Sequence, residues 1–133
     1  MTTSSQYFAN IGVAQIFVAN TALDGTGPMS LVYTAGNTAN SIGSIIKKII
    51  IKATGDTNQG MIRLFINNGT TTNLFMEISV PGTTQTSVVP AFSVVDINTG
   101  TLQAGYTLYA ATQNAESFNV IIVGTDIVNC ECS

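Results

Sequence analysis

Histidine and tryptophan are absent from this chain, and charged side chains are scarce. Without histidine there is no Ser-His-Asp triad and no histidine-ligated metal. Only 8% of the 133 residues are charged, against roughly 25% in an average globular protein. A surface with so few charges is typical of a protein that is largely surrounded by copies of itself or by a larger assembly. A secreted β-domain with a neutral surface is the alternative.

Basic residues are also few: four Lys and Arg give a net charge of −3 with the seven acids. Such a chain has no basic surface for nucleic acid. No apolar run approaches the roughly 20 residues that span a bilayer. The chain also contains no basic amphipathic segment of the kind that binds a membrane surface. The first residues, MTTSSQ, lack the basic start and apolar core of a signal peptide. We therefore expect no nucleic-acid partner, no membrane partner and synthesis in a cytoplasm.

The only cysteines, Cys130 and Cys132, stand within the last four residues. A Cys-x-Cys pair without histidine or further cysteine cannot complete a four-ligand zinc site in one chain. Two interpretations stay open: free thiols on a loosely held tail, or a disulfide between chains, since tails often meet at a symmetry axis.

The acidic residues are scattered and predict no reaction centre. A glycosidase needs two carboxylates that face each other across a cleft, whereas Glu77 is better explained as the partner of Arg63. Asp56 to Asn58 resembles the start of a calcium loop, but the glycine and glutamate that should follow are missing. We expect no catalytic residue, no metal and no cofactor, and hence not an enzyme.

What the chain does contain is alternation of apolar and polar residues, clearest over residues 61–80. Two alternating runs flank Asn67-Asn68-Gly69, which predicts a β-hairpin. If Ile66 pairs with Leu74, then Leu64 pairs with Met76 and Ile62 with Ile78, which forms one apolar face. The same register places Arg63 opposite Glu77 and Phe65 opposite Phe75 on the other face. Such cross-strand pairs each contribute roughly 0.2–1 kcal/mol.

The predicted outward pair of Phe65 and Phe75 has three candidate roles: a subunit contact, a sugar-stacking platform, or a face that the chain's own arm covers. The strands at residues 13–18 and 120–123 are apolar on both sides and also need cover from a second layer or another subunit. We predict that the partner interface contains Tyr7, Phe8, Arg63, Phe65, Phe75 and Glu77.

The third strand, residues 44–53, carries Lys47 and Lys48 in succession. Strict alternation would turn Lys47 into the core, where an unpaired charge is costly. We therefore predict a β-bulge at these lysines, which aligns Ile46 with Ile49 and Ile51 and sends both lysines outward.

Turn residues divide the chain into eight strands, and no stretch has helical spacing. This pattern predicts an all-β fold, an eight-stranded antiparallel β-sandwich that is jelly-roll-like. An immunoglobulin-like sandwich is the second candidate fold. It is less favoured because the chain has no tryptophan and both cysteines lie at its end, so the buried cysteine–tryptophan cluster of immunoglobulin domains cannot form. We expect an N-terminal arm at residues 1–10 that ends in Tyr7-Phe8, a single sandwich domain at 11–128 and a C-terminal tail at 129–133.

Four stretches carry a resemblance to a known class: GSIIKKIIIKATG from residue 43, GMIRLFI from 60, LFMEI from 74 and AESFNVIIVGTD from 115. Over residues 43–126 the chain resembles small β-rich virion structural proteins of tailed phages and prophages. The resemblance implies a structural protein of the particle, and among these a capsid decoration (cement) protein. Its implied partners are itself, as a homotrimer, and the major capsid protein, with a location on the capsid surface after synthesis in the host cytoplasm.

A glycan- or receptor-binding module of a head or tail fibre is the competing function. It predicts that the two phenylalanines lie in an open groove lined by Asn and Asp side chains. A major shell subunit is a third candidate, for which 133 residues is small.

Overall fold

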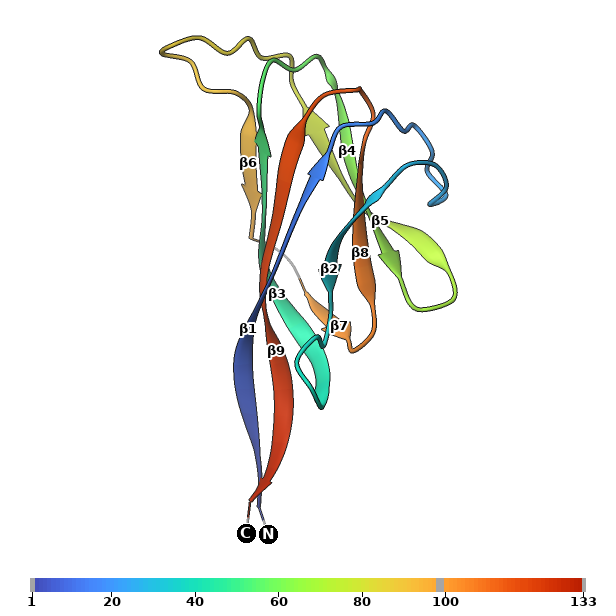
Figure 1. Cartoon of the computed structure of the whole chain (residues 1–133), viewed down its shortest axis with the longest axis vertical. Helices are drawn as coiled ribbons and strands as arrows, with labels where there is room; N and C mark the ends of the chain where they lie inside the picture. The colour runs from blue at the N-terminus through green and yellow to red at the C-terminus, as the bar shows by residue number, and fades with distance from the viewer. Residues whose placement is uncertain (1, 98–99, 133) are drawn as a thin grey trace.

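The computed structural model describes residues 2–97 and 100–132, with the side chains of residues 5–97 and 100–129. Two antiparallel sheets pack face to face, and the described residues contain no helix (Figure 1). The strands are β1 (Thr2–Ile16), β2 (Ser30–Thr34), β3 (Ser41–Ala53), β4 (Gly60–Asn67), β5 (Thr72–Val80), β6 (Ser93–Asp96), β7 (Thr101–Gln103), β8 (Thr107–Thr112) and β9 (Phe118–Cys132).

The five-stranded sheet has the order β1-β9-β3-β6, with β7 also paired to β3, and the four-stranded sheet has the order β2-β8-β4-β5. Nine strands are described where the sequence predicted eight, because the predicted seventh strand, residues 102–110, is divided into β7 and β8. Gly105 has a φ of +91°, and its N–H donates to Ala35 O at 3.0 Å. The chain turns at this point and passes from β7 in one sheet to β8 in the other.

The core fills the space between the sheets and consists of alternate residues from each strand. Ile49, Ile51 and Ile122 of the five-stranded sheet and Leu64 and Leu108 of the four-stranded sheet are fully buried. Burial of each such side chain contributes about 1.5–3 kcal/mol.

The hairpin of β4 and β5 confirms the first part of the predicted register and corrects the rest. Ile62 pairs with Ile78, Arg63 with Glu77 and Leu64 with Met76, as expected. The register then shifts, so that Phe65 pairs with Leu74 and Ile66 with Asn73. The predicted pairs Phe65–Phe75 and Ile66–Leu74 are therefore wrong.

The turn explains this shift. Asn67 Oδ1 accepts from Gly69 N at 2.7 Å, and Asn68 Oδ1 accepts from Thr70 N at 3.0 Å and Thr71 N at 2.9 Å. These bonds close a four-residue loop between Asn67 and Thr72, which pair with each other. From the pair Asn67–Thr72 to the pair Leu64–Met76, β4 advances by three residues and β5 by four. Phe75 is the extra residue of β5 and forms a β-bulge.

The bulge predicted in β3 is confirmed. The pairing of β3 with β9 shifts between Ile46 and Lys48, so that Lys47 is the extra residue. Lys47 and Lys48 are both exposed, while Ile46 and Ile49 on either side are buried. The extra residue therefore keeps the isoleucines in the core and both charges in water.

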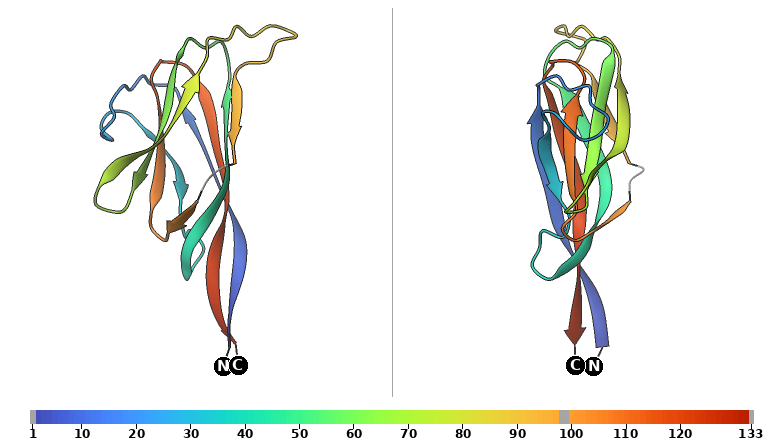
Figure 2. Two further views of the ribbon diagram at one scale, coloured as in Figure 1. Left: turned by 180° about the vertical axis from the view of Figure 1, so that it is seen from behind. Right: turned by 90° about the vertical axis from the view of Figure 1, so that its right-hand side faces the viewer.

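β1 and β9 pair over their full length, from Thr2 with Cys132 to Ile16 with Phe118, without a register shift. Residues 2–9 of β1 extend past β2, and residues 129–132 of β9 extend past the end of β3. Together with residues 125–128 of β9 they form a narrow stalk at one end of the molecule (Figures 1 and 2). The segments expected as an arm (1–10) and a loosely held tail (129–133) thus have paired backbones where they are described.

Candidate interaction surfaces

The outer face of the five-stranded sheet carries a row of aliphatic side chains that no other layer of the described residues covers. Val13 pairs with Ile121, Ile121 with Ile50 and Ile50 with Val95, so that the four lie side by side across the sheet. They point outward because their neighbours along the strands, among them Ile49, Ile51, Val120 and Ile122, point into the core. Val13 is 66% and Val95 53% exposed. We call these four residues the aliphatic row.

Further apolar and basic residues surround the aliphatic row. Ile11 pairs with Val123, which in turn pairs with Lys48, and Lys52 lies opposite Asn119. Lys52 Nζ donates to Ala91 O at 2.8 Å, which holds this side chain at the margin of the sheet. An apolar centre with polar and charged residues at its edge is the usual composition of a protein–protein interface.

The stalk presents Tyr7 and Phe8, two of the predicted interface residues. Tyr7 is 60% exposed and Phe8 42%, and as neighbours in a strand they point to opposite faces of the ribbon. The side chains of Cys130 and Cys132 lie outside the described residues, although their backbones pair with Ser4 and Thr2. The predicted disulfide between chains therefore lies outside the described residues.

The outer face of the four-stranded sheet holds the other predicted interface residues, and here the chain covers itself. Arg63 Nε lies 3.2 Å from Glu77 Oε2, so the predicted ion pair is present. Phe65 is fully buried, although it does not belong to the core between the sheets. Phe75 is 36% exposed. The two phenylalanines thus do not form an open aromatic pair.

The segment of residues 20–28 provides this cover. Asn20 N donates to Thr112 O at the end of β8, and Gly25 lies against Thr72 at the start of β5, where an added Cβ would be 2.6 Å from Thr72 Cγ2. Between these two points the segment crosses the outer face of the sheet (Figure 2). Arg63 lies on this face because its neighbours Ile62 and Leu64 point into the core. Of the three roles considered for the aromatic face, cover by the chain itself is the one that fits Phe65. The segment that crosses this face is residues 20–28 and not the expected arm, residues 1–10.

Asn20 fixes the covering segment with its whole amide group. Its Nδ2 donates to Thr26 O at 3.0 Å and Pro28 O at 2.8 Å, and its Oδ1 accepts from Ala22 N at 3.0 Å. Nothing in the sequence analysis singled out Asn20. A buried asparagine beside glycines and a proline is nevertheless a typical signal for a side chain that organises a loop.

Asp126 forms a buried polar centre that the sequence analysis missed. Its Oδ1 accepts from Ser44 Oγ at 2.5 Å and Asn10 Nδ2 at 2.8 Å, and its Oδ2 accepts from Thr38 N at 2.7 Å. Burial is the largest single influence on the pKa of Asp126 and raises it. The hydrogen bonds from Ser44, Thr38 and Asn10 together outweigh burial, so the pKa lies below the ordinary aspartate value of 3.8.

The hydroxyl of Tyr33 is buried close to this centre. Burial raises the pKa of Tyr33, and the negative charge of Asp126 acts in the same direction. Gly124 makes room for the tyrosine, because a Cβ there would stand 2.5 Å from Tyr33 Oη and 2.7 Å from Ile45 O. The centre joins β1, β3 and β9 at the point where the stalk leaves the sandwich.

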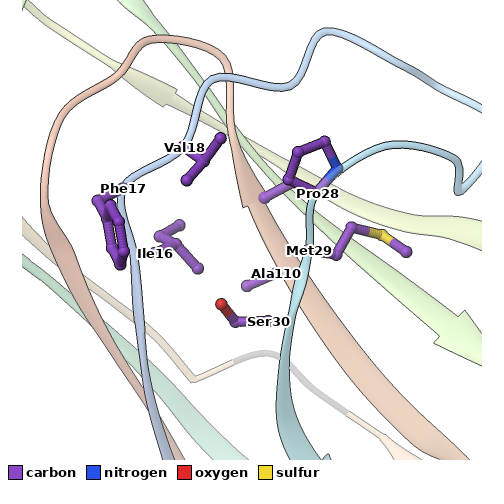
Figure 3. Close-up of a pocket in the computed structure, with 8 residues that line it drawn as sticks. Ile16, Phe17, Val18, Pro28, Met29, Ser30 and Ala110 are labelled. Carbon is purple, nitrogen blue, oxygen red and sulfur yellow. The ribbon is translucent and has the colours of Figure 1, made fainter.

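A small hollow of about 120 Å³ opens where the end of β1 approaches the start of β2 (Figure 3). Apolar side chains such as Ile16, Phe17, Val18 and Met29 line it, and none of its lining residues is titratable. Elsewhere, among the residues whose positions are described, no three acidic or cysteine side chains gather as metal ligands. No helix that would be long and apolar enough to cross a membrane occurs in that part of the chain.

The loop of residues 81–90 lies at the end opposite the stalk (Figure 1). Thr57 and Thr83 exchange backbone hydrogen bonds of 2.9 Å, and Asp56 Oδ1 accepts from Gln85 N at 2.8 Å. Asp56 and Thr57 therefore fasten this loop, as expected for a turn. Val88 in this loop is exposed.

No family model and no curated protein sequence matches the chain. Its fold is similar to that of a chain in the acidic stable capsid structure of Helicobacter pylori bacteriophage KHP30. That comparison has a TM-score of 0.51 and 12% identity, and it covers 98% of this chain and 100% of the other. A chain of dimeric latent PorU from Porphyromonas gingivalis aligns with a TM-score of 0.44 and 13% identity, over 90% of this chain and 13% of that one. At these identities the first similarity establishes a shared fold, an all-β sandwich.

Proposed function

We propose that this chain is a non-enzymatic structural protein of a phage virion, a capsid decoration protein that binds the outer surface of the shell as a homotrimer. The observation that carries the proposal is the uncovered aliphatic row. An apolar sheet face of this kind is buried in the working form of a soluble protein. The similarity in fold to a chain of a phage capsid and the low content of charge point to an assembly of the same class.

We also infer that the sandwich is a jelly roll. If β6 and β7 count as one interrupted strand on β3, eight strands remain, four in each sheet. The chain then alternates between the sheets except at the hairpin of β4 and β5, which gives two interlocked Greek keys. Jelly rolls are common in capsid proteins, so this topology agrees with the proposed role.

In the proposed trimer, the aliphatic rows of three copies meet around the symmetry axis. The stalk, with Tyr7 and Phe8, and the loop at Val88 remain at opposite ends for contact with the major capsid protein. Many weak contacts repeated by symmetry would add through effective concentration. The glycan-binding alternative is less well supported, because Phe65 is buried and the open pair of Phe65 and Phe75 that it predicts is not formed.

Substitution of Val13 tests the trimer. Val13→Glu places a charge in the aliphatic row and should convert trimers to monomers at micromolar concentration, measured by light scattering. Val88→Glu introduces the same charge at another exposed valine and should leave the mass unchanged. A wild-type chain that is monomeric at these concentrations contradicts the trimer.

The location is tested on particles induced from a host that carries the gene. An antibody against the chain, detected with gold in the electron microscope, should label the heads of intact virions. Label confined to tail fibres would favour the receptor-binding function, and unlabelled particles would contradict a virion role.

A further inference from the structure

β1 ends the five-stranded sheet on one side, and along the stalk no described strand pairs with its outer edge. From Asn10 to Gln15 the edge lies against β2: Asn10 Nδ2 donates to Thr34 O at 2.8 Å and Ser30 Oγ donates to Gln15 O at 3.0 Å. β2 begins and ends within this region, and residues 2–9 extend past it. The open edge is therefore the outer side of residues 2–9.

The direction of the backbone groups along this edge follows from Gln15. Its carbonyl accepts from β2 and thus points away from β9. In an antiparallel ladder, residues whose groups point away from the partner alternate with residues that bond to it. Because the ladder of β1 and β9 has no register shift, Ala9, Tyr7 and Ser5 share the direction of Gln15. Their N–H and C=O groups point to the open edge.

This edge lacks the features by which proteins prevent strand pairing. Natural edge strands are protected by lysine, proline, bulges or short length. β1 is 15 residues long, contains no charged residue and no proline, and has no bulge. By this criterion the edge is able to accept another strand.

The outer end of the stalk is also incomplete as a sheet. β3 pairs with β9 only up to Val128, so residues 129–132 and their partners 2–5 form a two-stranded ribbon. Such ribbons are marginally stable alone, and three or more strands are needed. Tyr7 and Phe8, at 60% and 42% exposed, leave on the order of 200 Å² of aromatic surface uncovered on the two faces.

We propose that the open edge of β1 pairs antiparallel with the same edge of a second copy of this chain, across a twofold axis. An identical strand matches the spacing of the free groups automatically and, being uncharged, brings no repulsion. The result is a continuous sheet of order β9-β1-β1-β9 through both stalks, with aromatic side chains on each face. If the proposed trimer is correct, this second contact links neighbouring trimers on the shell; the strand pairing itself does not depend on that role.

Proline at Ala9 tests the pairing. The N–H of Ala9 points to the open edge, so Ala9→Pro leaves the ladder with β9 intact and removes a donor needed by an added strand. Ala9→Ser is the matched control, because it retains the N–H at an exposed position. By sedimentation equilibrium, we expect a doubling of mass in the wild type, from monomer to dimer or from trimer to hexamer. Ala9→Pro should weaken this step at least tenfold, and Ala9→Ser should leave it within about twofold.

Amide hydrogen exchange of the wild-type chain provides a second measurement that needs no variant. The amides of Phe8 and Asn10, which bond to β9, should be protected at every concentration. The amides of Ser5, Tyr7 and Ala9 should become protected only as the concentration passes the dissociation constant of the mass-doubling step. Rapid exchange of these three amides in a fully associated sample overturns the pairing, as does association that Ala9→Pro leaves unchanged. If the chain forms a trimer but shows neither the mass doubling nor the amide protection, only the strand pairing is overturned. If the stalks pair but the chain is absent from virions, only the proposed function is overturned.

Discussion

At the scale of single residues, Asp126 shows how one carboxylate can join separate parts of the chain. Three hydrogen bonds connect it to β1, to β3 and to the loop between β2 and β3. Donors from three segments must meet at one side chain, so the centre fixes the position of β1 relative to the sandwich. It thereby sets the direction in which the stalk projects.

Acid should remove the stabilisation that Asp126 provides. Because its pKa is lowered by folding, the folded state favours the carboxylate, and the stabilisation is complete above the ordinary pKa of 3.8. It is lost as the pH falls through the lower pKa of the folded state. Asp126→Asn should reduce the free energy of unfolding by about 2–3 kcal/mol at pH 7. In urea titrations this difference from the wild type should shrink below about pH 4; a difference that is constant down to pH 3 would contradict an ionised Asp126.

Gly124 should not tolerate a methyl group. Gly124→Ala places a Cβ 2.5 Å from Tyr33 Oη and 2.7 Å from Ile45 O, and the second contact is with backbone that cannot rotate away. We expect a loss of about 1–3 kcal/mol in the free energy of unfolding, measured with urea. Gly55→Ala is the control, because nothing lies within 4 Å of its added Cβ. Equal stability of the two variants would contradict the close approach of Tyr33.

At the scale of strands, register shifts decide which side chains reach each face, and two of them bear on the predicted residues. In β3 the extra Lys47 restores the isoleucines to the core, and in β5 the extra Phe75 follows from the length of the turn. The first bulge was predictable because a buried lysine is costly. The second was not, because it depends on hydrogen bonds that Asn67 and Asn68 form only in the folded turn.

Deletion of Lys47 should therefore be tolerated. Without it, Ile46 and Lys48 pair with consecutive residues of β9, and the alternation of buried and exposed side chains becomes regular. We expect a cost of about 1 kcal/mol, as for a typical point change. Deletion of Ile50 shifts the neighbouring strand by one residue, turns core side chains outward and should prevent folding. Thermal unfolding followed by circular dichroism distinguishes the two; equal damage would contradict the assignment of Lys47 as the extra residue.

At the scale of the whole molecule, the two outer faces of the sandwich differ. Residues 20–28 cross the outer face of the four-stranded sheet (Figure 2), whereas Val13 and Val95 of the aliphatic row on the five-stranded sheet are exposed. Both faces carry apolar side chains, so composition does not distinguish them. The difference arises from the path of one loop.

Self-association through the aliphatic row should depend little on salt. The contact is apolar, and only 8% of the residues are charged, so ionic screening has little to act on. Between 50 and 500 mM NaCl we expect the dissociation constant of the trimer to change less than about threefold, and sulfate should tighten it. A steep loss of association with NaCl, measured by light scattering, would indicate instead that Lys48 and Lys52 meet an acidic surface.

The sequence by itself determined the class of the fold, because alternation with period two and turn residues at short intervals leave only an all-β arrangement. It also determined the bulge at Lys47 and the first half of the central hairpin, where local pattern and the cost of a buried charge agree. The pairing of Arg63 with Glu77 belongs to the same group.

Tertiary structure alone decided the rest. Phe65 is buried on the outer face of a sheet that a loop from elsewhere in the chain crosses (Figure 2), and Asp126 is a structural centre because its donors come from three distant segments. The arm and tail became one stalk because β1 and β9, more than 100 residues apart in the chain, pair along 15 residues. Such contacts depend on the path of the chain in space. The periodicity of apolar residues and the composition, by contrast, carry information only about residues that are close in sequence.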